Sequence, residues 1–181
     1  MTKLIIFNKP YNVLTQFSGE IHEQTLAAYI KMPGFYAAGR LDKNSEGLLL
    51  LTDDGLLQHQ LSHPKFNKKK YYWVQVEGLP TQQDLEPLRK GLKLSNVSFL
   101  PAQAHLITPP ALWPRNPPIR DRKNLPTCWL ELIIQEGKNH QVRKMTAAIG
   151  FPTLRLVRHR IGEWDLGELQ PGEFILLENQ R

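Results

Sequence analysis

A carboxylate in a loop between two predicted strands is the first residue of this sequence that could do chemistry. The loop Gly39-Arg40-Leu41-Asp42 separates apolar segments at 35–38 and 47–52. A carboxylate on such a loop can project into a cleft and act there as a nucleophile or a base. Taken alone, the tetrapeptide favours an ordinary turn in which the Asp side chain binds its own backbone. The surrounding sequence must therefore decide between catalysis and a simple turn.

Basic side chains concentrate late in the sequence. Residues 137–160 contain six Lys and Arg and no Asp or Glu, which equals the whole net charge of +6. A second basic cluster holds four lysines at 65–70, whereas the charged residues after 162 are mainly acidic. Segregated positive charge indicates a polyanionic partner, most simply nucleic acid. An ordinary solvated basic face is the alternative that composition leaves open.

The elements that must position these residues alternate between strands and a few short helices. Apolar or β-branched runs predict strands at 4–7, 35–38, 47–52, 71–77, 102–107, 128–135 and 154–161. Capping residues and apolar spacing predict helices at 25–32, 55–63, 81–90 and 139–149, and a hairpin at 92–100. Residues 109–126 hold six of the fourteen prolines and predict a loop excursion. The pattern is typical of an α+β domain around a mainly antiparallel sheet.

Length and composition exclude several classes of protein. The 181 residues suffice for one well-buried core, or for two lobes that share one sheet. No apolar run approaches the length of a membrane span, and the N-terminus lacks a secretory apolar region. One cysteine, Cys128, excludes an internal disulfide framework and a multi-cysteine zinc site. We expect a cytoplasmic monomer without a membrane partner.

Two further signals favour structural explanations over chemistry. His59 and His63 are four residues apart on a predicted helix, which is a spacing that can bind zinc. Because no third ligand is evident, an exposed pair is the preferred interpretation, and we expect no metal. Cys128 lies within an apolar strand, which favours packing over a nucleophilic role.

Four motifs, read in order, change the interpretation of the Asp42 loop. They are Asn8-Lys9-Pro10, the Asp42 loop with EGLLLLTDDG behind it, Lys70-Tyr71-Tyr72, and Glu136 to Met145 with the Leu156-Val157-Arg158 and Ile161-Gly162 that follow. This series resembles the motifs of the RsuA-type ribosomal pseudouridine synthases and covers nearly the whole chain. The resemblance implies the pseudouridine-synthase catalytic fold, a mixed and mainly antiparallel sheet flanked by few helices, with a central active-site cleft.

The same resemblance implies an enzyme that isomerises one uridine in ribosomal RNA, most simply the 23S RNA of the large subunit. We expect residues 1–181 to form a single catalytic domain that starts without the small N-terminal S4-type domain common in this family. No redox change or group donor is involved in the reaction, so we expect no cofactor. A non-catalytic RNA-binding or ribosome-assembly protein remains the alternative, and a base-excising hydrolase is a more remote one.

The resemblance also assigns roles to individual residues. Asp42 is implied as the catalytic carboxylate, with Arg143 beside it as a compensating cation. Tyr72 is expected against an extruded base, while its neighbour Tyr71 should point to the opposite face of the strand and into the core. The expected RNA contacts are Arg40, Lys138, Asn139, His140, Lys144, Arg155, Arg158 and Arg160.

Overall fold

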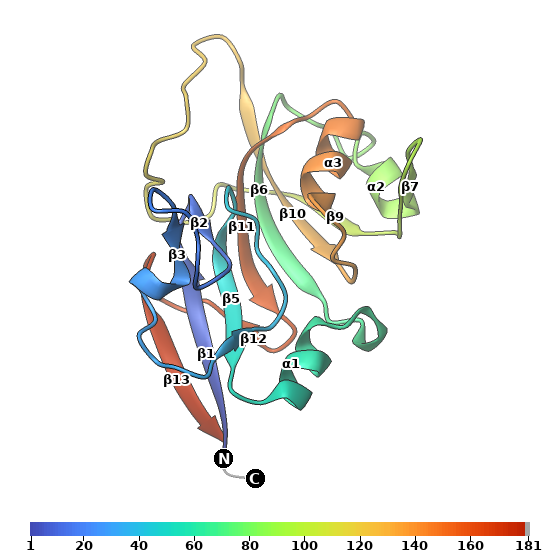
Figure 1. Cartoon of the computed structure of the whole chain (residues 1–181). Helices are drawn as coiled ribbons and strands as arrows, with labels where there is room; N and C mark the ends of the chain where they lie inside the picture. Colours follow the sequence, from blue (N-terminus) through green and yellow to red (C-terminus); the bar gives the residue numbers. More distant parts are fainter. Residues whose placement is uncertain (180–181) are drawn as a thin grey trace. The chain divides into compact units, whose positions relative to one another are not determined.

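The computed structural model describes residues 1–179, which divide into two compact units. Of these residues, unit 1 comprises 1–68 together with 158–179, and unit 2 comprises 69–157. Strand β11 (Thr153–Ile161) supplies its last residues to unit 1 and its first residues to unit 2. Figure 1 labels the elements of both units.

Unit 1 is built on strand β1 (Thr2–Lys9), which pairs antiparallel with β5 (Glu46–Thr52) on one side and β13 (Phe174–Asn179) on the other. Short strand β4 (Tyr36–Ala37) also pairs with β5, and β12 (Trp164–Asp165) pairs with β11. Every residue of β5 is buried, as its continuous apolar run predicts. The sheet therefore forms a rigid base for the loop that precedes β5.

The remaining elements of unit 1 are small. Strands β2 (Val13–Leu14) and β3 (Gln24–Thr25) pair in parallel, and short 3-10 turns lie at Leu26–Ala28 and Pro64–Phe66. Helix α1 (Gly55–Ser62) starts where predicted, with the Asp54 side chain accepting bonds from two backbone amides. The helix predicted at 25–32 shrinks to the single 3-10 turn, because Thr25 makes no side-chain cap and so short a helix needs such support.

In unit 2, strand β10 (Thr127–Ile134) pairs antiparallel with β6 (Lys70–Glu77) and with β9 (Gln103–Ile107). Strands β7 (Leu92–Lys93) and β8 (Ser98–Phe99) form the predicted hairpin. Helices α2 (Glu86–Lys90) and α3 (Gln141–Ala148) contribute apolar side chains to one core with alternate residues of β6 and β10. Cys128 packs against this core, which confirms its predicted packing role.

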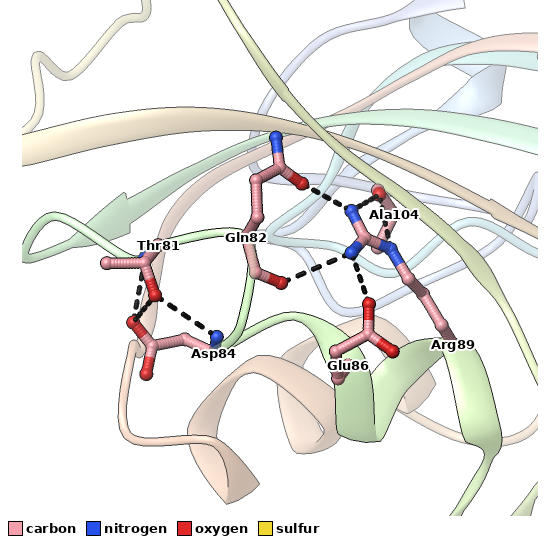
Figure 2. A network of polar contacts seen from close by, with 6 residues as sticks. All are labelled: Thr81, Gln82, Asp84, Glu86, Arg89 and Ala104. Carbon is pink, nitrogen blue, oxygen red and sulfur yellow. Dashed lines mark hydrogen bonds and ion pairs between the residues drawn. The ribbon is translucent and has the colours of Figure 1, made fainter.

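Helix α2 is shorter than the predicted 81–90 because its first residues form a capped turn instead. Thr81 and Asp84 bond reciprocally through side chains and backbone, which lowers the pKa of the Asp84 carboxyl (Figure 2). Pro87 has no amide hydrogen, so the helix can begin only just before it. The Arg89 side chain then ties the helix to β9 by donating twice to the carbonyl of Ala104, at 2.7 and 3.1 Å.

The proline-rich stretch contains neither helix nor strand between residues 109 and 126, as predicted. Arginine side chains hold it within unit 2. Arg122 forms an ion pair of 2.9 Å with Glu77, and the half-buried Arg115 donates to the carbonyl of Leu154. The α+β class and the mainly antiparallel sheet predicted from the sequence are confirmed.

Candidate functional site

The loop that carries Asp42 is fixed by its own backbone carbonyls. Arg158 donates to the carbonyl of Arg40, Thr15 to that of Leu41, and Ser45 to that of Asp42. The next carbonyl, that of Lys43, accepts the amide of Asn12 at 2.7 Å. Four consecutive carbonyls therefore accept hydrogen bonds. The half-buried Asp42 side chain projects from a backbone that has little freedom to move.

Leu41 anchors the same loop from inside. Its side chain is buried in the core cluster that contains alternate residues of β1 and β5. The Thr15 hydroxyl donates to the Leu41 carbonyl and accepts the Leu41 amide at 3.2 Å, so one side chain satisfies both backbone groups. Asp42 thus follows a residue that packing and hydrogen bonds hold together. Such support is what a positioned catalytic group requires.

Lys9, at the end of β1, lies under the loop with its side chain fully buried. Its ammonium group donates to the carbonyls of Pro10 and Val13, both at 2.8 Å, and reaches that of Lys43 at 3.5 Å. Burial lowers the pKa of Lys9 from 10.5 to about 7; the charges of Glu46 and Asp42 oppose this shift and that of Arg158 adds to it. The carboxylate of Asp42 therefore belongs to a group of interacting charges within unit 1.

The lowered pKa of Lys9 predicts a pH dependence of stability. Between the folded value of about 7 and the ordinary value of 10.5, Lys9 is neutral when folded and protonated when unfolded. Because the unfolded chain then binds more protons, the free energy of unfolding rises with pH across this interval, by up to about 1.4 kcal/mol per pH unit. Below this interval Lys9 is protonated in both states and contributes no pH dependence.

Urea unfolding of the wild type and of Lys9→Met, measured at a series of pH values, checks this expectation. The difference between their free energies of unfolding should shift in favour of the wild type as the pH rises through that interval. A difference that is constant with pH would show that Lys9 does not change its proton affinity on folding.

The two buried arginines differ from the remaining predicted RNA contacts. Arg158 is only 3% exposed and Arg155 only 7%. Arg158 donates to backbone carbonyls of unit 1, whereas Arg155 donates to the carbonyl of Trp113 at 2.8 Å and faces that ring in a cation–π contact. Their role as RNA contacts is still a prediction, and their burial argues against it.

Unit 2 carries the second group of predicted residues. Tyr72 is 8% exposed and lies in the core cluster beside residues of β6 and α3, whereas Tyr71 is half-buried on the other face of the strand. The expectation that Tyr71 is the core residue is therefore wrong, since the alternation along β6 runs the other way. Only a small part of the Tyr72 ring is exposed to solvent and open to contact.

Helix α3 presents a basic side. Val142 and Met145 enter the core, Arg143 is half-buried, and Lys144 is exposed. The approach to the helix is ordered, because the Gln141 side chain bonds both the Lys138 amide and the Glu136 carboxylate. The exposed residues among the predicted RNA contacts are Lys138, Asn139, His140 and Lys144 near this helix, and Arg40 and Arg160 in unit 1.

Sequence reasoning missed the residues that support the Asp42 loop. Lys9 appeared only as part of a motif, and neither Thr15 nor Glu46 was assigned a role. A lysine that ends an apolar strand, IIFNK, is a signal that could have found the first, because buried lysines need specific partners. No local pattern marks Thr15, whose partner lies 26 residues away.

Helices and histidines add two smaller findings. Within residues 1–179 none of the helices combines the length and the apolar character that crossing a bilayer requires. His59 and His63 are both exposed, and their rings lie 4.6 Å apart, with Phe66 edge-on to His59.

Comparison with known proteins shows which family the sequence and the fold resemble. Residues 3–148 match the model of the RNA pseudouridylate synthase family. The ribosomal large subunit pseudouridine synthase E of Vibrio parahaemolyticus is 56% identical over 172 residues, covering 95% of this chain and 72% of that protein. The protein of the same name from Xanthomonas axonopodis is 54% identical, covering 93% and 90%.

Solved structures share the fold at lower sequence identity. A crystal structure of a pseudouridylate synthase superposes with a TM-score of 0.81 at 27% identity, covering 98% of this chain and 71% of that one. The archaeal box H/ACA Nop10–Cbf5 complex contains a chain with the same fold, at a TM-score of 0.59 and 13% identity.

Proposed function

Because the chain belongs to the RNA pseudouridylate synthase family, we propose that it isomerises one specific uridine of large-subunit ribosomal RNA to pseudouridine. The observation that carries the proposal is the Asp42 loop, a carboxylate on a backbone held at four consecutive carbonyls. The choice of large-subunit RNA is supported by the names of the relatives that share more than half of their aligned residues with this chain.

The proposed reaction rearranges one nucleotide. The N1–C1′ bond breaks, the base turns over, and C5 bonds to C1′; N1 gains a proton and C5 loses one. Nothing is oxidised and no group is donated, so the chemistry needs no cofactor. An ionised carboxylate suffices to start it, either by covalent attack on a carbon or by removing a proton from the ribose. We assign this role to Asp42.

Roles in the reaction are also proposed for two residues of unit 2. Tyr72 is proposed to lie against the base, which must leave the RNA helix to be reached. A tyrosine ring offers a stacking face, and its hydroxyl can donate or accept a proton. Arg143 is proposed to compensate the charge of the catalytic carboxylate, because α3 leaves it half-buried rather than freely solvated. Both assignments rest on the family motifs.

The exposed cations near α3 and at 65–70 are proposed to bind RNA phosphates. If about five of them do so, log K should fall against log salt with a slope of roughly −3 to −4, at about 0.7 per single-strand contact. Binding of an unmodified RNA fragment measured over a series of salt concentrations gives this slope. A slope near zero would show that these cations do not bind RNA phosphates.

The proposed function is tested by mapping pseudouridine in RNA that carries none. The purified protein is incubated separately with transcripts of large-subunit and small-subunit ribosomal RNA, and new pseudouridines are mapped by carbodiimide treatment and primer extension. We expect one new stop, in the large-subunit transcript only. New stops confined to the small-subunit RNA would refute the proposed substrate. The absence of new stops in both transcripts would refute the proposed activity on free ribosomal RNA.

A further inference from the structure

Arg158 is a buried cation whose guanidinium donates hydrogen bonds to backbone carbonyls. Its Nε donates to the carbonyl of Leu48 on β5 at 2.9 Å, and its Nη1 donates to the carbonyl of Arg40 at 3.2 Å. The side chain is 3% exposed, so a phosphate of a bound RNA would have to displace protein groups to reach it. One guanidinium therefore connects a central strand to the loop, two residues before Asp42.

The position of Arg158 relative to β5 is set by a close backbone approach. Gly47 has a φ of +107°, and a Cβ atom added there would lie 2.2 Å from the Arg158 carbonyl oxygen. Only glycine permits both this φ and this contact. Lys9 pairs with Gly47 on the other side of β5. The close approach to Gly47 thus fixes the backbone of β11 at Arg158, whose guanidinium reaches the loop.

Two features of its surroundings reduce the contribution of Arg158 to stability. Its charge acts against the ammonium group of Lys9 and contributes to the lowered pKa of that residue. Among the residues that the structure describes, its buried Nη2 has no hydrogen-bond partner. A buried cation with an unused donor, placed near a second cation, does not favour folding. Stability alone therefore does not explain an arginine at this position.

We propose that Arg158 is a positioning residue for catalysis, which holds the Arg40 carbonyl and thereby orients the Asp42 carboxylate. The proposal rests on the proposed function, since it concerns the same isomerisation. It replaces the role as an RNA contact that the sequence suggested for Arg158. Catalytic groups must be held within a fraction of an ångström of their productive geometry, and buried hydrogen bonds of this kind supply that precision.

If Arg158 positions Asp42, its substitution should reduce the rate of catalysis without changing RNA binding. Arg158→Met removes both donors and leaves a shorter, uncharged and unbranched side chain of similar volume. Arg158→Lys keeps the charge, but its single ammonium group cannot reproduce the guanidinium's two bonds to the carbonyls of Leu48 and Arg40. We expect kcat at saturating RNA to fall by about 100-fold for Met and about 10-fold for Lys, because small displacements of a reacting group cost rates of this order. RNA affinity and the slope of log K against log salt should stay as in the wild type.

The test compares wild type, Arg158→Met, Arg158→Lys and the matched control Arg160→Met. Arg160 is exposed on the same strand, and its Nε donates to the carbonyl of Gly162. Arg160→Met should weaken binding and reduce the magnitude of the salt slope by about 0.7. Thermal unfolding of each variant fixes an assay temperature at which all are folded, so that a loss of kcat cannot come from unfolding.

Two results would overturn the proposal. Arg158→Met with normal kcat, weaker affinity and a shallower salt slope would make Arg158 a phosphate contact. Variants that are fully folded, with kcat equal to the wild type and unchanged binding, would make its bonds purely structural. Both results require a wild type that forms pseudouridine, so an inactive wild type would instead refute the proposed function.

Discussion

Asp42→Asn should abolish pseudouridine formation while leaving RNA binding intact. An amide is neither a competent base nor a nucleophile, so turnover should fall by about 10⁴-fold, the upper end of what acid–base catalysis contributes. RNA affinity should hold or increase slightly, because a negative charge near phosphates has been removed. Single-turnover assays and equilibrium binding on the same unmodified transcript measure the two effects.

The structure predicts that Asp42→Asn folds normally. The backbone carbonyl of residue 42 accepts the Ser45 amide at 3.0 Å, and this bond does not depend on the side chain. Circular dichroism and the urea midpoint serve as controls. Substantial pseudouridine formation by the folded variant would refute the role of Asp42. A folded variant that also loses RNA binding would show that Asp42 contributes to recognition.

Arg143→Ala should damage catalysis beyond its effect on affinity. If Arg143 compensates the charge of the catalytic carboxylate, as the family motif predicts, its loss leaves that charge unpaired. Removing one partner of a buried ion pair costs about 3–5 kcal/mol, so kcat at saturating RNA should fall by about 10²–10⁴-fold. Single-turnover rates at rising RNA concentration separate this effect from weaker binding.

Lys144→Ala is the matched control for Arg143→Ala. Lys144 follows directly on the same helix and is exposed, so its loss should weaken binding and reduce the magnitude of the salt slope. If Arg143→Ala shows only that behaviour and reaches normal turnover at saturating RNA, Arg143 is a phosphate contact.

Much of the fold could be predicted from the sequence because its strands are strongly apolar. The run Gly47–Thr52 identifies β5, the β-branched and aromatic residues of 71–77 identify β6, and Asp54 identifies the start of α1. Which face of β6 is buried was predicted wrongly, because Tyr72 rather than Tyr71 enters the core. The weaker helices were predicted too long. At 25–32 no side chain caps the start, and at 81–90 a Thr81–Asp84 turn competes with the helix.

The Asp42 loop illustrates what the sequence could and could not predict about the site. The loop and its carboxylate follow from local motifs, since Gly39, Arg40 and Asp42 lie within four consecutive residues. The supports of the loop are distant in sequence: Thr15 is 26 residues from Leu41, and Arg158 is 118 residues from Arg40. No local pattern distinguishes a buried arginine of a strand from an exposed one, so Arg155 and Arg158 were both assigned to RNA.

Release of the uracil C5 hydrogen shows directly whether this protein forms pseudouridine with Asp42. Forming the C5–C1′ bond expels this hydrogen as a proton, so RNA labelled with tritium at C5 of uridine loses tritium to water for each pseudouridine formed. We expect the wild-type protein alone to release tritium from large-subunit RNA until one uridine per molecule has reacted, whereas Asp42→Asn should release none. No release by the folded wild type while it binds this RNA, or equal release by Asp42→Asn, would contradict this expectation.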